Sequence, residues 1–322
     1  SLKGPIRQKG KWAFSDTDMI AYGHITRATD LVLDEKSRYA PKEAVFPVRE
    51  TLFRFLGDEA HVPDAEPKPL VLFLRPCDIH GLDRLDTVFL KNGPEQDFYY
   101  LRRRRLLKLM LIECTTGFDS CFCVSMGTNR SDAWDGAFRI AGGEALVALR
   151  DGDLATALPA DAASADFEPA FIEQNRVQVT PPPPEAITPE LFNHPVWTEY
   201  TDRCIACGRC NTSCVTCSCF TMQDVKTSDD GVLAERRRVW AGCHVDGFTD
   251  MAGGHSFRRK NGERMRFKTL HKIHDFKLRF GTHMCVGCGR CDDVCPEYIS
   301  ISACIGKLAT IAAEGQQHEK SV

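Results

Sequence analysis

Two runs of four cysteines constrain this chain more than any other feature. Each run has the spacing C-x2-C-x2-C-x3-C, and Pro296 follows the second. Three cysteines at such intervals suit a tight loop around a cubic iron–sulfur cluster, and in two-cluster ferredoxins the fourth cysteine ligates the other cluster. We therefore expect crossed ligation. One cluster would take Cys204, Cys207, Cys210 and Cys295, and the other would take Cys285, Cys288, Cys291 and Cys214.

Structural zinc is the alternative interpretation of these runs. Paired C-x2-C knuckles hold Zn²⁺ with only two cysteines each. A third and a fourth cysteine are more than zinc needs, and the same surplus occurs twice in this chain. The pattern therefore favours two [4Fe–4S] clusters and one-electron chemistry. A zinc-stabilised scaffold protein is the alternative from another functional class.

The composition fits a globular protein that uses thiols for metal or redox chemistry. The chain has 322 residues, of which 43% are hydrophobic and 26% charged, and it contains 16 cysteines. A chain of this length can bury a core without disulfides, so dense cysteine indicates metal binding in a reducing compartment. The net charge of -3 gives no reason to expect nucleic acid. No apolar run approaches the ~20 residues of a membrane span, and we expect a cytoplasmic protein.

A run of four prolines at residues 181–184 divides the chain. Proline fixes φ and lacks an amide donor, so such a run is stiff and extended. We place a domain boundary there and predict an α+β fold. Residues 1–180 would form a mixed α/β domain. Residues 181–322 would form a ferredoxin-like dicluster [4Fe–4S] domain, and the long insert between the motifs favours the helical type.

Apolar patterns give the expected elements. Residues 70–74 and 106–112 are apolar runs that suit strands, and residues 79–90 have helical spacing. Residues 150–153 resemble a hairpin turn. Thr188 and Pro189 form a helix start. Residues 219–225 and 232–240 suit the two arms of a hairpin, and residues 257–280 become helical toward their end.

Four cysteines of the first half could form a third centre. Cys77 follows the first predicted strand, Cys114 follows the second, and Cys121 and Cys123 lie in the loop beyond. If the two strands are parallel neighbours, their ends meet at one edge of the sheet, where sites form in α/β folds. We predict that these four thiolates hold a third [4Fe–4S] cluster. The alternative is that they are buried apolar side chains.

The last four cysteines are Cys217, Cys219, Cys243 and Cys304. Cys217 and Cys219 follow Cys214 so closely that we expect them in the same pocket, where cysteine packs as a small hydrophobic residue. Thiols beside cluster sulfurs can also tune the reduction potential. A fourth cluster from these four cysteines is the weaker alternative.

Positive charge gathers around the second cysteine run. Residues 251–290 contain ten Lys or Arg against Glu263 and Asp275. Nearby cations would favour the reduced state of an anionic cluster, or would attract an acidic partner. The alternative is a solvated helix face. We expect the short basic runs at residues 102–105 and 236–238 to face solvent.

Nucleotide fingerprints are absent from the sequence. Neither G-x-G-x-x-G nor G-x4-G-K-[ST] occurs. The electron donor and the acceptor are therefore expected on other chains, and we assign no catalytic acid, base or nucleophile.

Several of these motifs together match a known family. They are the run Arg-Pro-Cys-Asp-Ile-His-Gly-Leu at 75–82, Cys114, Cys121-x-Cys123, Gly253-Gly254-His255 and the double cysteine run. This combination resembles the iron–sulfur subunits of the sulfhydrogenase beta type, and looks most like the A subunits of anaerobic sulfite reductases. The resemblance covers most of the chain. Val215 departs from it, because proline is usual after the fourth cysteine, but proline there is a turn preference and not a ligand.

The resemblance implies a three-subunit assembly. A subunit that binds FAD and NADH would supply electrons, this chain would carry them, and a subunit with sirohaem would reduce sulfite to sulfide. The alternative partner is that of a sulfhydrogenase or nickel–iron hydrogenase, for which this chain would be the electron-transfer beta subunit.

Overall fold

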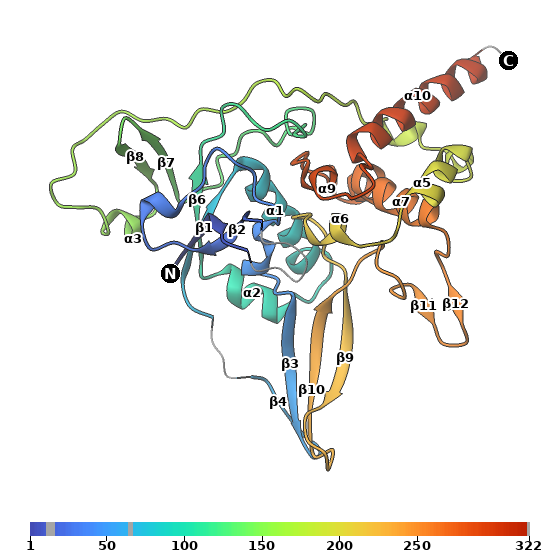
Figure 1. The fold of residues 1–322 in the computed structure, drawn as a ribbon, viewed down its shortest axis with the longest axis horizontal. Helices are drawn as coiled ribbons and strands as arrows, with labels where there is room; N and C mark the ends of the chain where they lie inside the picture. The colour runs from blue at the N-terminus through green and yellow to red at the C-terminus, as the bar shows by residue number, and fades with distance from the viewer. Residues whose placement is uncertain (11–16, 64–66, 321–322) are drawn as a thin grey trace.

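A six-stranded sheet forms the centre of the first half of the chain (Figure 1). The computed structural model describes residues 1–10, 17–63 and 67–320. The strand order is β2-β1-β5-β6-β7-β8, with parallel pairs in the middle and antiparallel pairs at both edges. The strands are β1 (Leu2–Gln8), β2 (Met19–His24), β5 (Leu70–Leu74), β6 (Leu107–Ile112), β7 (Gly136–Ala141) and β8 (Glu144–Leu149).

The predicted strands at 70–74 and 106–112 are confirmed as β5 and β6, and they pair in parallel. Between them run α1 (Pro76–Leu90) and α2 (Phe98–Arg104). The predicted helix at 79–90 is confirmed as part of α1, which begins at Pro76 because proline suits the first turn. Leu72, Leu82 and Leu111 are fully buried where the sheet and helices meet. This crossover carries Cys77 and Cys114 to the same edge of the sheet.

The predicted turn at residues 150–153 is wrong. The hairpin of β7 and β8 turns at Gly142 and Gly143, whose φ angles are 61° and 85°. Residues 152–155 instead form the short helix α3 (Gly152–Ala155). The carboxylate of Asp151 accepts a hydrogen bond from the Leu154 amide, so this Asp-Gly pair begins a helix where a turn was expected.

A second sheet extends from the body as an arm (Figure 1). Its strands, in order, are β4 (Glu59–His61), β3 (Arg49–Leu56), β10 (Leu233–Trp240) and β9 (Phe220–Lys226). The hairpin predicted for residues 219–240 is confirmed as β9 and β10. Since β3 pairs with β10, strands from both sides of residue 180 share this sheet. The division of the chain at residues 180 and 181 stays a sequence-based prediction.

Arg238 shows that the basic run at 236–238 does not simply face solvent. Its side chain is 2% exposed, and it forms ion pairs with Glu50 at 2.8 Å and Asp97 at 2.6 Å. Arg103 of the other basic run pairs with the same Glu50 at 2.9 Å. The expectation fails here because carboxylates far away in the sequence neutralise the buried guanidinium.

Helices dominate the last part of the chain. They are α4 (Pro189–Phe192), α5 (Thr198–Arg203), α6 (Arg209–Thr212), α7 (Asn261–Leu270), α8 (Phe276–Phe280), α9 (Arg290–Asp293) and α10 (Ile301–Lys320), with a π-helical turn (His271–Asp275) between α7 and α8. A small hairpin, β11 (Asp250–Met251) and β12 (His255–Ser256), precedes α7.

This helical part has its own core. Trp197, Tyr200 and Met265 pack with Ile305 of α10, and α5 and α10 both contact α7. The helix predicted at 188–189 is only the single turn α4, and α5 is the helix that leads to Cys204. The helical character expected near the end of residues 257–280 is confirmed. Within the described residues, no helix is long and apolar enough to cross a membrane.

Candidate iron–sulfur centres

The two cysteine runs follow the same backbone path. Gly208 before α6 and Gly289 before α9 have left-handed φ angles of 71° and 70°. Two residues earlier, Ala206 and Gly287 are also left-handed, with φ of 53° and 62°. A residue with a Cβ atom is sterically disfavoured at positive φ. The positive φ of Ala206 therefore indicates that the surrounding structure fixes the backbone there. The two loops therefore form a structural repeat, and the helices that follow them, α6 and α9, contact each other.

The first cavity lies where the end of the second run meets the first run. Its lining includes Ile205, Met265 and Ile299, and it holds about 480 Å³ of space free of atoms, its open mouth included. Cysteines of both runs contribute to the wall. They include Cys204, Cys207, Cys210 and Cys295, the set expected from crossed ligation, and also Cys291.

The second cavity contains the complementary set. It holds about 370 Å³ of space free of atoms, its open mouth included, and its lining includes Phe122 and Val286. Its four cysteines are Cys214, Cys285, Cys288 and Cys291. The structure therefore brings each fourth cysteine to the other run, which is the arrangement that crossed ligation requires.

The chemistry of both cavities fits a cluster of several atoms. The thiols surround a space, and among the described residues no three His, Cys, Asp or Glu side chains converge on a site for a single ion. Burial raises the pKa of Cys285 to about 12, opposed by the Gly287 amide that donates to its sulfur. Burial also raises the pKa of Cys204, opposed by the Ala206 amide in the same way. Such thiols lose their protons when metal binds, so cluster assembly would release protons.

The four cysteines of the first half also come together. Cys114 follows β6, and its carbonyl accepts a hydrogen bond from the Ile172 amide at 2.7 Å. Burial raises the pKa of Cys123 to about 12, and negative charge on Cys121 and Cys114 adds to this effect. Burial raises the pKa of Cys77 well above its usual value, with smaller contributions from charge on Asp78, Cys288 and Cys123. Cys77, Cys114 and Cys121 thus all lie within electrostatic range of Cys123, as the predicted meeting of the two strand ends requires.

Asn175 contributes a polar atom to this third group. Its Oδ1 accepts a hydrogen bond from the Val124 amide at 2.8 Å and lies 3.5 Å from the sulfur of Cys123. Its Nδ2 is buried and has no hydrogen-bond partner in the described part of the chain. A buried donor without a partner costs free energy. An iron–sulfur cluster would offer it acceptor sulfurs, so the residues present fit a third cluster.

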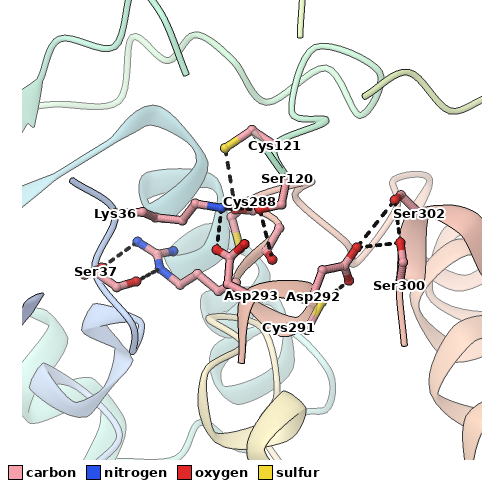
Figure 2. Close-up of polar contacts among 12 residues, drawn as sticks. Lys36, Ser37, Ser120, Cys121, Cys288, Cys291, Asp292, Asp293, Ser300 and Ser302 are labelled. Atoms are coloured by element: carbon pink, nitrogen blue, oxygen red, sulfur yellow. Dashed lines mark hydrogen bonds and ion pairs between the residues drawn. The ribbon is translucent and has the colours of Figure 1, made fainter. Parts of the chain in front are cut away.

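The loop that carries the third group is pressed against the second cysteine run. The Phe122 amide donates to the Gly287 carbonyl at 2.8 Å, and the sulfur of Cys121 lies 3.6 Å from the Cys288 carbonyl. The Lys36 ammonium donates a hydrogen bond to the same Cys288 carbonyl at 3.1 Å and forms an ion pair with Asp293 at 2.7 Å (Figure 2). Cys288 therefore lies between the second cavity and the third group.

Gly287 should be essential for this contact. A Cβ there would lie 2.6 Å from the backbone carbon and oxygen of Phe122, and φ is 62°. Gly287→Ala should therefore lower iron content and speed thermal bleaching of the cluster absorbance. Gly281→Ala is the matched control, because φ there is 76° but nothing lies within 4 Å of the added Cβ. It should cost only the left-handed strain of roughly 1–2 kcal/mol. Equal behaviour of the two variants would show that the close contact is unimportant.

The remaining cysteines do not form one set. The Nδ2 of Asn211 lies 3.6 Å from the sulfur of Cys217 and 3.3 Å from that of Cys243. Cys219 and Cys243 are within electrostatic range of each other. Cys304 is fully buried on α10 beside Thr269, at 3.6 Å, away from this group. A fourth cluster ligated by these four cysteines therefore has no support in the fold.

Three buried lysines were not singled out by the sequence. Lys42, Lys268 and Lys272 are 2–4% exposed. Lys42 donates to the Cys217 carbonyl at 2.8 Å, and Lys272 donates to Thr216 Oγ1 at 2.8 Å. The solvated-face interpretation of the basic stretch is wrong for Lys268 and Lys272. Their spacing of four residues on a helix already places them on one face, but only the fold shows that this face is buried.

Thiolate sulfur, the form in which cysteine binds metal, would keep Lys268 charged. Burial alone would lower its pKa, but negative charge on Cys210, Cys291 and Cys217 outweighs this and holds the pKa well above its usual value. Burial also opposes the charged form of Lys272, and charge on Cys214, Cys217 and Cys285 again raises the pKa. These cations are therefore matched to the anionic ligand sets of the two cavities.

Comparison with known proteins agrees with this chemistry. Residues 203–299 match the model of a 4Fe-4S dicluster domain. Over 310 residues the chain is 28% identical to sulfhydrogenase 2 subunit beta of Pyrococcus furiosus, a match that covers 92% of this chain and 88% of that protein. No solved structure matches. The chain carries a 4Fe-4S dicluster domain and is a distant homologue of that beta subunit.

Proposed function

We propose that this chain is the iron–sulfur electron-transfer subunit of an oxidoreductase complex. The observation that carries the proposal is the pair of cavities, each lined by cysteines from both runs as crossed ligation requires. Bound [4Fe–4S] clusters would supply one-electron transfer. The ligands would be Cys204, Cys207, Cys210 and Cys295 for the first centre, Cys285, Cys288, Cys291 and Cys214 for the second, and Cys77, Cys114, Cys121 and Cys123 for a third.

The placement of the residues supports a linear path. The third group borders Cys288 of the second centre, and Cys291 lines both cavities. Cys207 of the first centre is exposed at the surface. Ile205 and Tyr298, beside that cavity, are 59% and 87% exposed. We infer that the surface around Cys207 faces a redox subunit, because large exposed apolar side chains are typical of binding sites.

The iron content of the protein tests the proposed third centre separately. Anaerobically reconstituted protein should hold about 12 irons per chain, at four irons per cluster. Cys114→Ala and Cys123→Ala should each reduce this to about 8 and leave the two other centres spectroscopically unchanged. Cys219→Ala serves as the control, since Cys219 is outside all three ligand sets and should keep the full iron content. A value of 8 in the unmodified protein would rule out the third centre.

The identity of the partners is the finer part of the proposal. The family resemblance carried by the motif at 75–82 and its companions implies a donor subunit with FAD and NADH and a sirohaem subunit that reduces sulfite. The name of the homologue instead favours a hydrogenase partner, for which this chain would be the beta subunit. Anaerobic purification of the chain with its native partners separates these functions. Sirohaem in the complex supports the sulfite reductase, and nickel supports the hydrogenase.

A further inference from the structure

One helix lies alongside both cavities. Met265 of α7 lines the first cavity, Lys268 lines both, and Lys272 in the following π-helical turn lines the second. The three residues are three and four positions apart, so they lie on one helix face. The π-helical turn begins at His271, between the two lysines. Such turns are frequent at functional sites.

Lys268 is the residue that the two cavities share. Its side chain is 4% exposed, and it forms no ion pair with a carboxylate among the described residues. An uncompensated buried ammonium is strongly unfavourable, so its counter-charge must come from the cavities. It lines the first cavity together with Cys210 and the second together with Cys285. Lys272 differs, because it lines the second cavity, with Cys214 and Cys285, and does not line the first.

We propose that Lys268 is a positioning residue that raises the reduction potentials of both centres, whereas Lys272 acts on the second centre alone. This inference rests on the proposed crossed ligation. A fixed positive charge favours the reduced, more negative state of a nearby cluster, and the low dielectric of the interior strengthens the effect. A cation on the boundary between two clusters stabilises an electron on either one.

The test is an anaerobic redox titration of the intact holoprotein followed by EPR. Lys268→Met should shift both midpoint potentials downward, and Lys272→Met should shift only the potential of the second centre. Lys268→Arg keeps the charge and should leave both potentials near those of the unmodified protein. Cys204→Ala and Cys285→Ala identify which EPR signal belongs to which centre.

The outcomes separate this inference from the function on which it rests. If the unmodified protein shows no [4Fe–4S] signals, the proposed function fails before any lysine is changed. An unchanged potential at either centre in Lys268→Met, with iron content intact, overturns the shared role. If Lys268→Met loses iron, Lys268→Gln is titrated in its place. Loss of both centres from both neutral variants, with retention in Lys268→Arg, also supports a shared cation.

Discussion

Cys295→Ala should abolish the centre that belongs to the first cysteine run, although Cys295 lies in the second. The reason is that Cys295 lines the cavity of Cys204, Cys207 and Cys210. Cys214→Ala should likewise abolish the centre of the second run, because Cys214 lines the other cavity. Each change should remove about four irons per chain, since a cubic cluster deprived of one of four ligands is poorly held.

EPR spectra of four variants would test whether each cysteine run supplies the fourth ligand of the other cluster. The spectrum of Cys295→Ala should match that of Cys204→Ala, and the spectrum of Cys214→Ala should match that of Cys285→Ala. Cys304→Ala is the matched control, because Cys304 is fully buried but lies outside the three ligand sets. It should retain all signals. If Cys295→Ala resembled Cys285→Ala, each run would ligate its own cluster, and the crossed assignment would be wrong.

The sequence predicted those elements of the fold that depend only on residues close together in the chain. The apolar runs gave β5 and β6, and their parallel pairing brought Cys77 and Cys114 to one edge. The hairpin of β9 and β10 was also predicted, because its turn lies between two strand-like runs. Its pairing with β3 was not, since alternation of side chains does not specify a partner strand from another part of the chain.

Burial of charge was the main thing that the sequence did not reveal. Lys268 and Arg238 belong to basic stretches, for which a solvated surface is the ordinary interpretation. Their burial depends on counter-charges distant in sequence, which are Cys210 and Cys291 for Lys268 and Glu50 and Asp97 for Arg238. In both cases the charged residue marks a place where distant segments meet.

The ion pair between Arg290 and Asp78 is the most deeply buried of the ion pairs that join distant segments among the described residues. Arg290 lies between Cys288 and Cys291, and Asp78 follows Cys77. Their side chains are 2% and 0% exposed, and two guanidinium nitrogens donate to the two carboxylate oxygens at 2.6 and 3.0 Å. Arg290 also donates to the Ser37 carbonyl at 3.0 Å, and the Tyr22 hydroxyl donates to Asp78 at 3.1 Å. This ion pair therefore connects the first half of the chain to the second cysteine run.

Asp78→Asn and Arg290→Met should each destabilise the protein by about 3–5 kcal/mol, because one buried charge loses its partner. The double variant should lose less than the sum, since neither charge is then left alone. Asp224→Asn is the control, because its ion pair with Arg236 is exposed to solvent and should contribute little to stability. Anaerobic unfolding in denaturant, followed by circular dichroism and cluster absorbance, measures these effects.

The two signals of that experiment also test how the halves of the molecule depend on each other. If the pair holds the third group against the second cysteine run, each single variant should lose cluster absorbance at the same denaturant concentration at which it loses secondary structure. Separate transitions, with the cluster absorbance of the single variants as resistant as that of Asp224→Asn, would mean that the pair contributes to the first half alone. A coincident shift would establish Arg290 as the link between cluster binding and the packing of β5 and α1, since Asp78 lies in the first turn of that helix.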